Sequence, residues 1–141
     1  MKEALTAFQD GDNVYLQGKF IEFDTPDNTG RVITKQNFVN QFDYLNDKID
    51  NGYLFGEFGQ PITFEVSMEN VSHSIEALYI EENKVMGRIR VLDTKKGHEL
   101  LGVLNSGKSV YMGYRSTSQH ITNDITFEKI YAFDIISEDD F

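Results

Sequence analysis

Hydrophobic and polar residues alternate along several stretches of the chain, and this period of two predicts β-strands with one buried face. Residues 84–93 are the clearest case, with Val, Gly, Ile and Val at every second position. Residues 71–81 precede them across a short turn, so the two stretches predict an antiparallel hairpin. Further strands are expected at residues 13–25, 52–60, 62–68, 108–115 and 125–136.

Two other stretches have the longer period of an α-helix. In residues 34–50 the apolar side chains fall at i, i+4, i+7 and i+11 starting from Phe38, which is one stripe of an amphipathic helix. Thr34 is suited to cap the start of this helix, and Gly52 is suited to close its end. A second helix is predicted over residues 94–107.

These elements predict an α+β fold in which strands outnumber helices and neighbouring strands run antiparallel. About seven strands are best arranged as a closed or curled β-barrel, with the two main helices packed outside it. We expect one domain over residues 1–141, with residues 1–12 as a loose N-terminal arm and residues 137–141 as an acidic, frayed tail.

Composition narrows the class of partner. The net charge is −10, and the 13 Lys and Arg residues are scattered among 23 acidic ones, which disfavours direct binding to a nucleic-acid backbone. No run approaches the roughly 18 apolar residues of a membrane span, and the N-terminus lacks the apolar stretch of a signal peptide. The chain has no cysteine, which excludes disulfides and a thiolate metal site. We therefore expect a soluble, non-secreted protein.

Few residues offer chemistry of their own. The three histidines, His73, His98 and His120, are far apart and lack the i, i+4 spacing of a metal site. The acidic face of the first helix lacks the spacing of a calcium-binding loop, and no glycine-rich phosphate loop is present. We expect neither a cofactor nor a metal. A Ser–His pair that combines Ser116 or Ser118 with His73 or His120 stays open, because such sites are recognised by geometry.

Five segments carry motifs that occur together and in this order in one group of proteins. They are N-T-G-R-V-I-T at residues 28–34, G-E-F-G-Q-P at 56–61, the hairpin and helix cap at 71–97, G-Y-R-S-T-S at 113–118 and F-D-I-I at 133–136. In this respect the chain resembles the prohead (capsid-maturation) serine proteases of tailed phages, whose fold is distantly similar to that of herpesvirus assemblin. The resemblance covers roughly residues 14–136 and implies the same curled-barrel fold.

The resemblance also implies where a catalytic site would lie. The family's general-base histidine corresponds to Gln60, and its nucleophilic serine corresponds to Arg115. Glutamine has no basic nitrogen and arginine stays protonated, so neither residue can do that chemistry. These two positions predict a protein that is not an enzyme. A buried Arg115 needs an anionic partner, and we expect it to fill the former site by pairing with Glu57, Glu128 or Asp134.

The function implied is that of a catalytically inactive structural protein of a tailed-phage virion, located in the capsid, its inner lining or the neck. Its expected partners are other virion proteins (major capsid, portal or neck proteins), without direct contact to nucleic acid or membrane, and self-association is left open. The alternative is an active capsid-maturation protease that uses a rearranged pair of Ser116 and His73. A third reading is an adaptor that binds an extended peptide at an exposed sheet edge.

Overall fold

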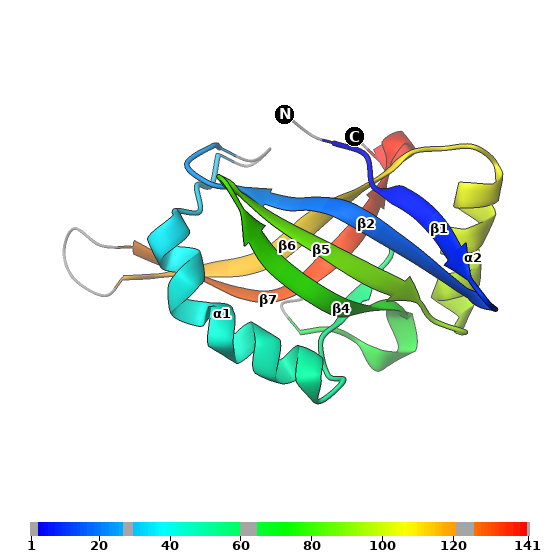
Figure 1. Cartoon of the computed structure of the whole chain (residues 1–141), viewed down its shortest axis with the longest axis horizontal. Coiled ribbons are helices and arrows are strands. Elements are labelled where there is room, and N and C mark those ends of the chain that lie inside the picture. Colours follow the sequence, from blue (N-terminus) through cyan, green and yellow to red (C-terminus); the bar gives the residue numbers. More distant parts are fainter. Residues whose placement is uncertain (1–2, 27–29, 60–64, 121–125, 141) are drawn as a thin grey trace.

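Two antiparallel β-sheets form the centre of the protein. The computed structural model describes residues 3–26, 30–59, 65–120 and 126–140 (Figure 1). The larger sheet has the strand order β1-β2-β5-β4-β3, and the smaller sheet pairs β6 with β7. The strands are β1 (Thr6–Asp10), β2 (Asn13–Glu22), β3 (Phe55–Glu57), β4 (Val71–Glu81), β5 (Lys84–Val91), β6 (Val110–His120) and β7 (Thr126–Ser137).

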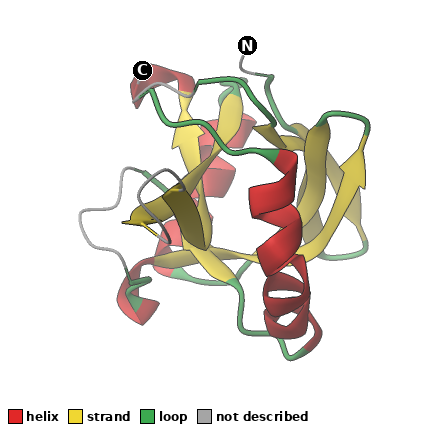
Figure 2. Cartoon of the chain, turned by 90° about the vertical axis from the view of Figure 1, so that its left-hand side faces the viewer, coloured by secondary structure: helices red, strands yellow, loops and turns green. Residues whose placement is uncertain are grey.

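Two α-helices lie outside these strands (Figure 2). They are α1 (Lys35–Asp50) and α2 (Lys95–Asn105), which confirms both predicted helices to within two residues at each end. The Oγ1 atom of Thr34 accepts a hydrogen bond from the backbone N–H of Asn37 at 3.1 Å and so caps α1. Two short 3₁₀ turns, η1 (Met68–Asn70) and η2 (Glu138–Asp140), complete the described elements. No helix in the described ranges is both long and apolar enough to cross a membrane.

The core lies between the two sheets. The rings of Phe20 on β2 and Phe133 on β7 have centroids 5.2 Å apart and join the sheets across it. A side chain at Gly87 would come within 2.6 Å of the Phe20 ring, so this position of β5 requires glycine. The helices bury Phe38 and Leu100 against the same core.

The sheets do not close into a barrel, and the predicted closed barrel is wrong in this respect. At one seam the N–H of Leu5 donates to the carbonyl of Val110 at 2.9 Å, and at the other the N–H of Gly59 donates to the carbonyl of Ile135 at 2.9 Å. The strand ladders do not continue across either seam in the described residues. The long β6–β7 hairpin therefore remains a separate sheet that extends beyond the larger one (Figure 1).

Four further predictions need correction. Residues 6–10 form β1 rather than a loose arm, because their backbone pairs with β2. Only Phe55–Glu57 of the strand expected at residues 52–60 is regular. The described part of the strand expected at 62–68 forms no strand, and residues 60–64 lie outside the description. The acidic tail begins with an ordered turn, η2.

A candidate active site around Arg115 and Ser116

Arg115 and Ser116 are neighbours in β6, and both side chains are buried, with exposed fractions of 6% and 7%. Neighbouring residues of a regular strand face opposite sides of the sheet. The pairing of β6 with β7 shifts register between these two residues, since Arg115 pairs with Ala132 and Ser116 with Ile130. The extra residue at this shift is Tyr131 of β7, while β6 continues without an insertion. Arg115 and Ser116 are therefore consecutive positions of one strand that are covered by different parts of the fold.

Arg115 is held by two carboxylates. Its Nε donates to Oδ2 of Asp134 and its Nη2 to Oδ1 of Asp134, both at 2.8 Å, which is a bidentate pair. Nη2 also donates to Oε2 of Glu57 at 2.8 Å, and Nη1 donates to the carbonyl of Glu65 at 2.9 Å. Burial acts to lower the pKa of Arg115, but the hydrogen bonds and charges of Asp134 and Glu57 outweigh it and raise the pKa above its ordinary value.

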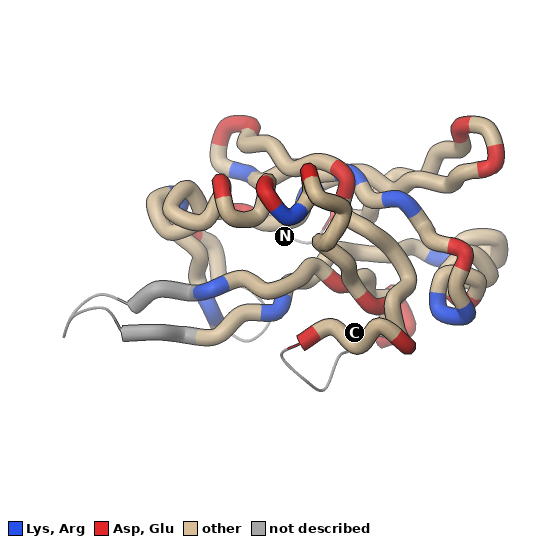
Figure 3. Tube along the Cα trace, turned by 90° about the horizontal axis from the view of Figure 1, so that it is seen from below, with Lys and Arg blue, Asp and Glu red and all other residues tan. Residues whose placement is uncertain are grey.

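This cluster joins four parts of the chain. The backbone N–H of Glu57 donates to Oδ1 of Asp134 at 2.9 Å, and the N–H of Ser67 donates to Oε2 of Glu57 at 3.0 Å. β3, β6, β7 and the segment before η1 are thus fixed to one another by a single guanidinium and its two acids. Figure 3 shows basic positions on both strands of the β6–β7 hairpin.

Ser116 has a different environment. Nη1 of Arg31 donates to its Oγ at 2.7 Å and to its carbonyl at 3.2 Å. The same guanidinium lies 5.3 Å from the centre of the Tyr114 ring, a cation–π contact that helps to fix its position. Ser116 is therefore a buried hydroxyl that accepts a hydrogen bond from a charged donor.

His73 is fully buried on β4 and has both ring nitrogens occupied. Nε2 lies 2.8 Å from the carbonyl of Phe133, and Nδ1 lies 2.7 Å from Oγ of Ser72. A carbonyl only accepts, so Nε2 donates and Nδ1 accepts from the Ser72 hydroxyl. Burial lowers the pKa of His73 to about 4, against the opposing effects of the Phe133 carbonyl and Asp134. His73 and Ser116 therefore form no hydrogen bond in this arrangement.

The other sequence-predicted residues are distributed unevenly. Glu57 and Asp134 contact Arg115. Gln60 lies outside the described residues, and the side chains of Ser118, His120 and Glu128 are not described either. That Arg115 fills a former catalytic site stays a prediction. His98 lies on the surface of α2, with Nε2 2.6 Å from Oδ1 of Asp93. No group of three or more potential metal ligands occurs in the described part of the chain.

Sequence reasoning missed Arg31, although a signal was present. Arg31 belongs to the N-T-G-R-V-I-T motif, one of the five segments that resemble the protease family. Arg31 and Ser116 are 85 positions apart in the sequence, so no local pattern can reveal their contact. Only the fold brings the first and fourth of the five motifs together.

Comparison with known proteins adds the decisive observation. A family model described as prohead core protein serine protease matches residues 1–131. The chain belongs to this family. No curated protein matches it. Among solved structures, the bacteriophage T4 capsid assembly protease, gp21, is similar in fold, with a TM-score of 0.73 and 18% sequence identity over 96% of this chain and 90% of that one.

Family membership overturns the prediction that the chain is not an enzyme. That prediction rested on Gln60 and Arg115 at the positions of the family's base and nucleophile, but the family is one of serine proteases. The position of Ser116 explains the error. Ser116 is buried directly beside Arg115, so the arginine does not remove a serine from this part of β6.

Proposed function

We propose that this chain is a serine protease of capsid maturation in a tailed phage, with Ser116 as its nucleophile. The observation that carries the proposal, within this family, is the hydrogen bond of 2.7 Å from Nη1 of Arg31 to Oγ of Ser116. Arg31 and Ser116 come from two segments that resemble family motifs. They supply a hydroxyl and a fixed positive charge at one place.

This contact suits nucleophilic attack. The hydrogen bond from Arg31 engages a lone pair of the Ser116 Oγ and not its hydrogen, so this contact is compatible with proton donation from Oγ to a base. In the reaction, Oγ bonds to the carbonyl carbon of the substrate while its proton passes to the base, which gives a tetrahedral intermediate. The C–N bond then breaks, the base returns the proton to the leaving amine, and water hydrolyses the acyl-enzyme that remains. The charge of Arg31 favours the negative charge that develops in the first step.

His73 does not serve as the base in this arrangement. Its Nε2 donates to Phe133 and its Nδ1 accepts from Ser72, so no lone pair faces Ser116. A Cβ at position 56 would come within 2.3 Å of Nε2, so glycine at this position of β3 leaves the space that the His73 ring occupies. We therefore assign His73 to the link between β4 and β7.

The substrates we propose are extended segments of proteins in the assembling head, such as the core or major capsid protein. This follows from the descriptions of the family as prohead core proteases and of the T4 enzyme as a capsid assembly protease. The place of action is then the phage prohead. Contacts with portal or neck proteins belong to the same proposal as further partners.

Substitution of the proposed nucleophile tests this function. A serine-directed fluorophosphonate should label the full chain, and Ser116→Ala should abolish labelling and reduce cleavage of purified prohead proteins by at least about a thousandfold. Ser118→Ala tests the neighbouring serine of β6, and Ser106→Ala is a control on the exposed end of α2. Labelling that survives Ser116→Ala but is lost in Ser118→Ala would move the nucleophile to Ser118.

A second substitution tests where the proton acceptor belongs. If the resemblance aligns Gln60 with the family's general base, Gln60→His should raise the labelling rate of Ser116 by about a hundredfold, the usual contribution of a positioned base. His120→Gln is the matched change at the histidine that follows β6's serines. A loss of activity in His120→Gln, with no gain in Gln60→His, would place the base at His120 instead.

A further inference from the structure

The outer edge of β1 is an unusual feature of the larger sheet. β1 is the outermost strand, and all five of its residues are exposed. Its backbone pairs with β2 on one side, and within the described ranges residues 6–10 make no backbone hydrogen bond on the other. Edge strands are commonly protected by lysine, proline or a bulge. β1, with the sequence T-A-F-Q-D, has none of these.

An aromatic stack lies directly beside this edge. Phe8 pairs with Tyr15 in the register of β1 and β2, and their rings stack with centroids 5.2 Å apart at an angle of 14°. The Arg88 guanidinium lies 5.8 Å from the centre of the Tyr15 ring. Phe8 remains 38% exposed at the end of this stack. A strand added to β1 would place a side chain directly against it.

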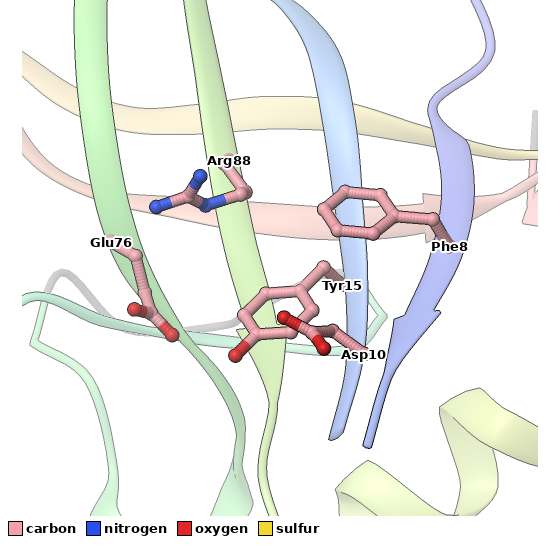
Figure 4. Close-up of a pocket in the computed structure, with 5 residues that line it drawn as sticks. All are labelled: Phe8, Asp10, Tyr15, Glu76 and Arg88. Carbon is pink, nitrogen blue, oxygen red and sulfur yellow. The ribbon is translucent and has the colours of Figure 1, made fainter. Parts of the chain in front are cut away.

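Charged groups set the chemistry of the neighbouring hollow, which has a volume of about 160 Å³ and is lined by Phe8, Asp10, Tyr15, Glu76 and Arg88 (Figure 4). The Glu76 carboxylate already pairs with Arg90, with Oε1 3.0 Å from Nε. Asp10, at the edge itself, has no ion pair among the described residues. The hollow is smaller than the 300 Å³ or more of small-molecule sites, and it suits one side chain of a peptide.

We propose that the outer edge of β1 binds an extended peptide segment of another protein by strand addition, with an aromatic residue against Phe8 and a Lys or Arg two residues away against Asp10. Strand addition satisfies the free backbone groups of β1, and alternate side chains of the added strand give specificity. The net charge of −10 favours a basic segment. It also opposes pairing of β1 with a second copy of the chain.

A designed peptide probe tests the proposal on the full chain. The probe is acetyl-Thr-Lys-Thr-Phe-Thr-Lys-Thr-amide, which presents Lys, Phe and Lys on one face in either strand direction. The first comparison probe replaces both lysines with Glu, and the second carries N-methyl groups at alternate backbone nitrogens. Binding is measured by fluorescence anisotropy of labelled probes, and its position by amide chemical-shift changes in the ¹⁵N-labelled protein.

We expect the Lys probe to bind with shift changes centred on residues 6–10, and the N-methylated probe not to bind. Asp10→Lys should weaken binding of the Lys probe about fivefold and make the Glu probe the better ligand, as expected for one cross-strand charge pair. Asp12→Lys changes the net charge equally at an exposed turn position and should alter binding less than twofold.

Several outcomes would overturn the proposal. They are no binding of the Lys probe, shift changes at β3 or the β6–β7 hairpin instead of β1, equal binding of the N-methylated probe, or equal effects of Asp10→Lys and Asp12→Lys. The last would indicate attraction to the whole acidic chain. Dimerisation in sedimentation equilibrium that is lost on Phe8→Ser would assign the edge to a second copy instead. None of these results depends on whether Ser116 is the nucleophile.

Discussion

Arg115 and Ser116 are adjacent in the chain and equally buried, but their surroundings differ in kind. Arg115 is enclosed by two carboxylates and a carbonyl, and every contact of this cluster joins one structural element to another. Ser116 lies beside the charged side chain of Arg31, from which its Oγ accepts a hydrogen bond. Two consecutive positions of β6 thus differ, one stabilising the fold and the other suited to chemistry. A motif alignment that is wrong by one residue therefore assigns the position of the nucleophile to Arg115 instead of Ser116.

The largest effect on stability is expected from removing Arg115. Arg115→Ala leaves Glu57 and Asp134 buried without a counter-charge, and breaking a buried pair in this way costs about 3–5 kcal/mol. Arg115→Lys keeps the charge but loses the bidentate geometry, so its cost should be smaller. Urea unfolding followed by circular dichroism measures both.

Arg88→Ala is the matched control for this prediction, because Arg88 is an exposed arginine with a cation–π contact to Tyr15 alone in the described structure. It should change the free energy of unfolding by less than about 0.5 kcal/mol. If Arg115→Ala were as mild as Arg88→Ala, the cluster would contribute nothing to stability and the contrast between Arg115 and Ser116 would fail.

Much of the fold follows from local patterns along the chain. Whether the two sheets close into a barrel does not. The alternation in β5 and the stripe of α1 that begins at Phe38 depend on neighbours along the chain, so the sequence reveals them directly. β1 has no alternation because all its residues are exposed, and its pairing with β2 became visible only in the structure. The way in which the two sheets meet depends on contacts between distant segments, such as the hydrogen bond from Gly59 to Ile135.

The candidate site, like the fold, was predictable only in part. Glu57, Glu128 and Asp134 were the predicted partners of Arg115 because they are the carboxylates nearest to it in the resembling motifs, and Arg115 contacts Glu57 and Asp134. The role of Arg31 was missed because its partner is distant in sequence. The partners that cover Arg115 and Ser116, such as Glu57 and Arg31, lie far away in sequence, so no local pattern shows which of the two residues contacts which partner.

The second prediction concerns pH and tests whether His73 belongs to the structural side of this comparison. The native ring stays neutral down to about pH 4, whereas in the unfolded chain it takes up a proton near pH 6.5. The unfolded state therefore binds more protons between these values, and the stability provided by His73 is complete above pH 6.5 and falls as pH decreases toward 4. The loss over this window is about 3 kcal/mol.

The unfolding free energies of the wild type and His73→Gln are measured from pH 7 to pH 4. Over this range the free energy of the wild type should fall by this amount more than that of His73→Gln. His98→Gln is the control, since His98 is exposed on α2 and its side chain retains 64% of its accessible surface. A slope unchanged in His73→Gln would mean that this histidine already exchanges protons in the native state, as a working base would.

The smallest predicted effect concerns Arg31 and separates its charge from its hydrogen bond. Arg31→Gln keeps an N–H donor near Oγ of Ser116 but removes the positive charge, whereas Arg31→Met removes both. If charge assists the attack, both variants should lower the rate of fluorophosphonate labelling by about tenfold, the equivalent of 1.4 kcal/mol of lost transition-state stabilisation. If the hydrogen bond alone orients the hydroxyl, Arg31→Gln should label at nearly the wild-type rate and only Arg31→Met should be slow. Equal rates in all three proteins would leave Arg31 as a packing residue over Tyr114 and would remove the main physical support for Ser116 as the nucleophile.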